Sequence, residues 1–196
     1  MRGRAALKRR MAQKPENTMA DTGHAFLGQS RRLLAAEYLP KIEQCIRLLP
    51  EDDLWWRPNP ASNSVGNLLL HLAGNLRQWI AHGVGGAPDM RTRSTEFDTK
   101  EGRSSAELLA NLAAAVAEAD RVLAALPPAQ LFDQRRIQGI NVSVLEAVYH
   151  VVEHFSTHVG QIIYITKMRT GKDLRFYAIN SDGTVRRGWL PPLEEE

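Results

Sequence analysis

Apolar residues recur at helical spacing in four stretches of the chain. Between residues 22 and 49 they fall about every four positions, which is typical of one stripe of an amphipathic helix. Pro40 interrupts this stripe, so we expect the first helix to be kinked or split there. Three further stripes, at residues 65–79, 109–126 and 148–162, predict three more helices, and no stretch has a convincing strand pattern. The pattern therefore predicts an all-α fold, a four-helix bundle with irregular termini.

Residues that favour helix ends lie at the borders of these stripes. A cluster of good N-cap residues at 62–64 precedes the second helix. Capping boxes, Ser104 with Glu107 and Ser143 with Glu146, predict the starts of the third and fourth helices. Gly171 is expected just past the end of the fourth. The long polar stretch 84–103 is interpreted as a loop, of a length that is often functional, and residues 129–142 as another connection.

Composition and charge divide the chain into three parts. Its 196 residues, 43% of them hydrophobic, suit one domain with a substantial core. The net charge of +3 arises from residues 1–18, which hold six basic side chains and one acidic one, so the remainder has a net charge of −2. We therefore expect a disordered basic extension at 1–20, a helical domain at 21–178 and an irregular tail at 179–196. Whether residues 1–18 belong to the mature protein is open, since Met19 offers an alternative start.

The same features argue against several classes of partner. The mildly acidic folded part gives no reason to expect nucleic-acid binding. No apolar run is long enough to cross a bilayer, and no apolar segment follows the basic residues as a secretory signal requires. Cys45 is the single cysteine, so no intramolecular disulfide can form, which suits the cytoplasm. A small core residue is the expected role of Cys45, and a reactive thiol is the alternative.

Histidines supply the candidate chemistry. His154 and His158 are four residues apart in the predicted fourth helix, so both lie on one face, and such a pair binds transition metals. His71 lies in an aliphatic run of the second helix and is the best candidate for a third ligand, because facing helices of a bundle meet at the core. Three histidines leave a coordination position open, which is typical of a catalytic site. The alternative is that these are core histidines that hydrogen bond to their neighbours.

Other polar residues near these histidines have subsidiary roles in this hypothesis. His150 is one turn before His154, but the helical twist turns it away from a metal shared with His158, so we expect it to support the site or to lie at the surface. Gln161 is a candidate to orient a ligating ring, and Asn75 is a candidate to face the pocket. No carboxylate base is evident beside the three histidines, so no catalytic residue is assigned.

Two segments on separate helices resemble the DinB-like metal-binding superfamily. They are NSVGNLLLHL at 63–72 and HVVEHFSTHVGQI at 150–162, and Trp-Trp-Arg-Pro at 55–58 and residues 93–97 extend the similarity, which runs from about residue 26 to about residue 177. The resemblance implies a DinB-like four-helix bundle, usually a homodimer, with a zinc or nickel ion held by three histidines. On the family pattern these are His71, His154 and His158. Some relatives are transferases or isomerases that use a low-molecular-weight thiol.

These observations lead to a functional hypothesis with an open alternative. We expect a divalent-metal-binding protein that acts on a small molecule, as a metal-dependent thiol transferase, isomerase or hydrolase. The alternative is a non-catalytic metal-binding or structural module. The sequence names neither the substrate nor the metal, because imidazole suits both zinc and nickel.

Overall fold

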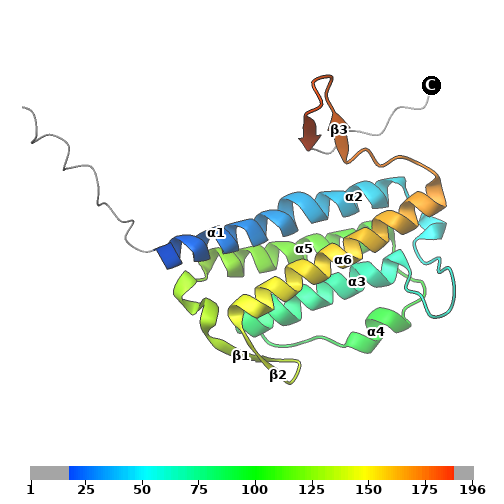
Figure 1. Cartoon of the computed structure of the whole chain (residues 1–196). Helices are drawn as coiled ribbons and strands as arrows, with labels where there is room; N and C mark the ends of the chain where they lie inside the picture. The colour runs from blue at the N-terminus through cyan, green and yellow to red at the C-terminus, as the bar shows by residue number, and fades with distance from the viewer. Residues whose placement is uncertain (1–17, 188–196) are drawn as a thin grey trace, which may run out of the picture.

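The computed structural model describes residues 18–187 and is predominantly helical, with 67% helix and 7% strand (Figure 1). The predicted helical class is therefore confirmed, and the predicted absence of strands is wrong. The proposed extension at 1–20 lies almost entirely outside the described residues, as does the end of the tail after residue 187. Among the described helices, none is both long and apolar enough to cross a membrane.

The first helical segment is not split at Pro40, which was one of the two expected outcomes. It consists of α1 (Thr18–Leu33), the π-helical turn η1 (Leu34–Tyr38) and α2 (Leu39–Leu48). Pro40 has no N–H and its ring crowds the preceding turn, so an ordinary α-helical turn cannot be completed there. The turn before it is widened instead, and the N–H of Leu39 donates to the carbonyl of Leu34, five residues back. The interruption in the sequence thus becomes a π-bulge.

The other three long helices begin at serine caps. Helix α3 (Val65–Leu76) starts at Ser64 and continues into the π-helical η3 (Arg77–Val84), α5 (Ser105–Ala125) starts at Ser104, and α6 (Val144–Thr170) starts at Ser143. The two predicted capping boxes are both formed. Helix α6 ends at Gly171, whose φ of 67° is left-handed, as predicted. Short 3₁₀ turns, η2 (Glu51–Asp53) and η4 (Pro128–Phe132), lie in the connections.

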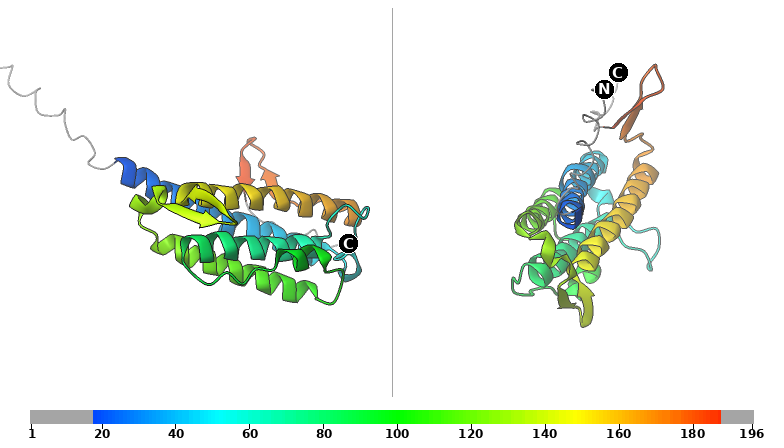
Figure 2. Two further views of the ribbon diagram at one scale, coloured as in Figure 1. Left: turned by 90° about the horizontal axis from the view of Figure 1, so that it is seen from below. Right: turned by 60° about the vertical axis from the view of Figure 1, so that its left-hand side comes forward.

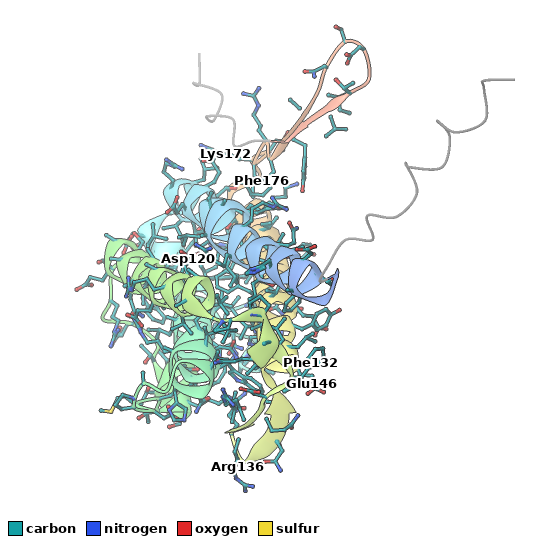
Figure 3. The ribbon with its side chains drawn as sticks, turned by 90° about the vertical axis from the view of Figure 1, so that its left-hand side faces the viewer. Asp120, Phe132, Arg136, Glu146, Lys172 and Phe176 are labelled. Carbon is teal, nitrogen blue, oxygen red and sulfur yellow. The ribbon has the colours of Figure 1, made fainter. Side chains whose placement is uncertain are left out.

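The long helices lie side by side around one apolar core. Helix α3 contacts α5 and α6, and the first helical segment packs across α5 and α6 (Figure 2). The view along the helices shows their side chains filling the space between them (Figure 3). The packing brings α3 directly beside α6, which positions the histidines. Fully buried core side chains come from all of these helices, including Ile42, Leu69, Leu72, Leu112, Val151 and Phe155.

Three short elements lie where the sequence suggested irregular structure. Strands β1 (Gln134–Ile137) and β2 (Ile140–Ser143) form an antiparallel hairpin within the predicted connection 129–142. Its two-residue turn has positive φ at Gln138 (51°) and Gly139 (81°), as a type I′ turn requires. Strands β3 (Tyr177–Ile179) and β4 (Val185–Arg187) form a second hairpin, which corrects the prediction of an irregular tail from residue 179. Helix α4 (Arg93–Asp98) interrupts the predicted loop 84–103.

Candidate metal centre

The three predicted histidines come together between α3 and α6. His154 and His158 lie one turn apart on α6, and His71 faces them from α3. One ring nitrogen from each lies within 4.8 Å of the others, and His71 is only 4% exposed. Tetrahedral zinc with bonds of about 2.0–2.1 Å places its ligand nitrogens about 3.4 Å apart, so modest ring rotations suffice to fit an ion.

The hydrogen bonds to the outer ring nitrogens of His71 and His158 select the tautomers of these two rings that metal binding needs. His71 Nδ1 lies 2.9 Å from Glu96 Oε2, so Nδ1 donates a proton and Nε2 carries a lone pair. That Nε2 lies 2.8 Å from Nε2 of His154. His158 Nδ1 donates to Gln161 Oε1 at 2.7 Å, which leaves the lone pair on His158 Nε2. His158 Nε2 is buried and has no hydrogen-bond partner among the described residues, as expected of a ligand nitrogen that awaits a metal.

Burial favours the neutral forms of His154 and His158. Desolvation, helped by the neighbouring histidines, lowers the pKa of His154 to about 3. Desolvation also lowers the pKa of His158, against the opposing effect of its bond to Gln161. A protonated imidazole cannot bind a metal, so the lowered pKa values of these two rings favour the form that could bind a cation at neutral pH.

Glu96 is the most important site residue that the sequence reasoning missed. No carboxylate base was evident beside the histidines from the sequence, but a carboxylate does lie there, because Glu96 reaches His71 from α4 and is itself buried. Arg91 binds the carboxylate with two hydrogen bonds, Nε to Oε1 at 2.7 Å and Nη2 to Oε2 at 2.8 Å. Burial raises the pKa of Glu96, but the bonds from Arg91 and His71 outweigh burial and lower it. Glu96 is therefore an ionised group that orients His71, not a free base.

A clamp at the start of α3 carries Glu96 to this position. Asn67 completes the cap of α3 with Ser64, and its Nδ2 also donates to the carbonyls of Glu96 and Thr99, both at 2.8 Å. Arg57 joins them, because its Nη2 donates to Asn67 Oδ1 at 2.8 Å and to the Phe97 carbonyl at 3.1 Å. The loop is thus tied to α3 through backbone carbonyls.

Gly74 makes room for the carboxylate. A Cβ atom at this position would overlap Glu96 Oε1 and lie 3.0 Å from both Glu96 Cδ and Arg91 Nε. In the sequence, the length of the polar stretch 84–103 pointed to both residues, and the family similarity at 93–97 pointed to Glu96.

The remaining predicted residues occupy different places. Gln161 contacts His158, as described. The ring of His150 packs against those of Trp79 and His154, with centroid distances of 4.1 Å and 5.4 Å, so His150 lies beside the cluster. Asn75 is buried on α3, and none of the hydrogen bonds in the described part of the chain joins it to the three histidines.

Comparison with known families adds one finding. A family model described as "Protein of unknown function (DUF1572)" matches residues 21–183. The chain belongs to this family. The match covers the described helices, the first hairpin and strand β3, and leaves out the first three residues of α1 and all of strand β4. Comparison with curated proteins gives no match.

Proposed function

We propose that the protein binds one divalent metal ion, zinc or nickel, through His71, His154 and His158, and that the long helices form a DinB-like four-helix bundle. The observation that carries the proposal is the buried, unpartnered Nε2 of His158 within the histidine cluster. An unsatisfied buried nitrogen costs about 1–3 kcal/mol, and a metal ion would remove that cost. Glu96 and Gln161 support the proposal, because each fixes the outer nitrogen of one ligand.

We further propose that the metal centre is that of an enzyme acting on a small molecule, with thiol transfer as the reaction it suits best. Three protein ligands leave at least one position for an exchangeable group. A bound zinc or nickel ion would supply Lewis acidity there and lower the pKa of a coordinated thiol or water. Hydrolysis is less well supported, because the nearest carboxylate, Glu96, already accepts from Arg91 and His71 and is not free to activate water.

Elemental analysis of the untagged protein tests metal binding. The wild type is expected to retain about one zinc or nickel per chain, and His154→Ala and His71→Ala to lose it. His24→Ala is the matched control, because His24 is exposed on α1, away from the cluster. Metal content that is unchanged in His154→Ala and His71→Ala would show that the cluster is not the site.

A turnover assay tests the reaction class. The metal-loaded protein is mixed with a low-molecular-weight thiol and a chromogenic electrophile such as 1-chloro-2,4-dinitrobenzene, with and without chelator. Thiol-dependent turnover that is lost on chelation is expected. Thermal stabilisation by metal without turnover across a panel of such pairs would instead assign a non-catalytic metal-binding module.

A further inference from the structure

A cavity of about 540 Å³ lies one helical turn from the histidine cluster, within the size range of small-molecule sites. One wall is the C-terminal half of α6 and the other is the segment 58–63 that leads into α3. These two parts of the chain lie side by side in Figure 1, where α3 begins beside the orange end of α6. The segment contains Pro58 and Pro60, and its Asn59 side chain accepts from the Ala61 N–H, so this wall is stiff before any ligand binds.

The cavity and the cluster share the contact between α3 and α6. Leu68 lines the cavity and precedes His71 by three residues, and Thr157 and Gln161 lie three residues beyond His154 and His158. Residues spaced by three share a helix face, so the cavity lies next to the histidines along the contact between α3 and α6. Gln161 joins the two directly, because it lines the cavity while its Oε1 accepts from His158.

The lining chemistry restricts what the cavity accepts. None of the described residues that line it carries a formal charge. Ser62 Oγ donates to Asn59 Oδ1, and Thr157 Oγ1 donates to the Glu153 carbonyl. Both hydroxyl oxygens therefore keep lone pairs that can accept hydrogen bonds from a ligand. Gln161 uses its oxygen on His158 and keeps its amide N–H groups as donors. A charged group would lose hydration here without a counter-charge, whereas a hydroxyl or amide would find both donors and acceptors.

Gly160 has no explanation in the packing of the chain. It lies inside the 27-residue helix α6, where glycine costs about 1 kcal/mol relative to alanine. A Cβ at Gly160 would meet nothing within 4 Å, so no neighbour requires its absence. The space that the missing side chain leaves belongs to the cavity.

We propose that this cavity is the substrate pocket of the metal centre and holds an uncharged part of the substrate that bears hydroxyl or amide groups. The proposal rests on the proposed function, since the other end of the substrate reaches the metal. Gly160 and the segment 58–63 set the volume of the pocket, and Gln161 couples its occupant to the ligand His158.

Hydroxamates of different tails test the pocket without knowledge of the substrate. Acetohydroxamic acid is the short probe, which can reach only the metal ion. Two longer hydroxamates carry a tail of three methylene groups, which ends in a carboxamide in one and in a carboxylate in the other. In calorimetry with the zinc-loaded full chain, the carboxamide probe is expected to bind at least tenfold more tightly than acetohydroxamic acid, and the carboxylate probe to gain nothing. Gly160→Leu is expected to abolish the tenfold gain and to leave acetohydroxamic acid binding unchanged. Gly28→Leu is the control, because a Cβ there also meets nothing within 4 Å, on α1.

The outcomes separate the pocket from the metal centre. Equal affinity for all three probes would overturn the proposed pocket, and so would a tenfold gain of the carboxamide probe that persists in Gly160→Leu. In either case, zinc-dependent binding of acetohydroxamic acid would still support the metal centre. Failure of the wild type to bind either zinc or nickel would overturn both. If Gly160→Leu loses its helical circular dichroism, Gly160→Met decides, since a flexible side chain fills the same space with less strain.

Discussion

Replacing Gly74 by alanine is expected to weaken metal binding although Gly74 has no group that could touch a metal. The new methyl group would occupy the position of Glu96 Oε1, so the carboxylate must move away from His71. His71 then loses the bond that orients its ring. Loss of such an outer partner costs 10–100-fold in metal affinity, or about 1.4–2.8 kcal/mol.

The same substitution has two opposing effects on stability. Alanine is the better helix former by about 1 kcal/mol. Against this, Glu96 and Arg91 form a pair whose side chains are only 8% and 4% exposed, and breaking a buried pair costs about 3–5 kcal/mol. The pair dominates, so we expect Gly74→Ala to unfold more easily by about 2–4 kcal/mol.

Zinc competition with a chromogenic chelator measures the affinity, and urea unfolding of the metal-free protein measures the stability. Gly28→Ala is the matched control, because it makes the same chemical change in an exposed helical position with no neighbour within 4 Å. It should bind zinc like the wild type and be slightly more stable. Wild-type zinc affinity in Gly74→Ala would refute the idea that Glu96 positions His71.

Three further predictions concern the rest of the chain. Cys45 is fully buried and desolvation raises its pKa to about 11, so Ellman's reagent at pH 8 should label it only after unfolding. Arg57→Ala should lower stability by about 1–3 kcal/mol and speed amide exchange in α4, since the clamp loses its charged donor. Hydrogen bonds from Ser143 lower the pKa of Glu146 below its ordinary 4.5, so its contribution is present at neutral pH and lost as the pH falls through the lowered value. Glu146→Gln should therefore be less stable than the wild type at pH 7 and equal to it in strong acid.

For each of these predictions, one outcome would contradict the reasoning. Rapid labelling of native Cys45 would contradict its burial, and unchanged exchange in Arg57→Ala would show that Asn67 alone holds α4. A stability difference for Glu146→Gln that persists at pH 2 would show that the capping box does not depend on the charge of its carboxylate.

Local sequence signals determined the long helices and the relative placement of two of the three histidines. A capping box needs only residues three apart, and the left-handed end of α6 needs only Gly171. The spacing of His154 and His158 fixes their shared face, because the geometry of one helix is enough to place them. His71 was predictable less directly, from an imidazole in an apolar run that had to face another helix.

Tertiary structure decided everything that depends on residues far apart in the chain. Glu96 lies 25 residues after His71 in a polar stretch without periodicity, and only the docking of α4 by Asn67 and Arg57 brings it to the ring. Gly74 acts by having no side chain, which leaves room for the Glu96 carboxylate. No local sequence pattern shows which distant side chain needs that room. The hairpins were missed because short, largely exposed strands need no apolar alternation. The sequence by itself therefore determined the long helices and the pair on α6, while packing brought His71 and Glu96 to that pair.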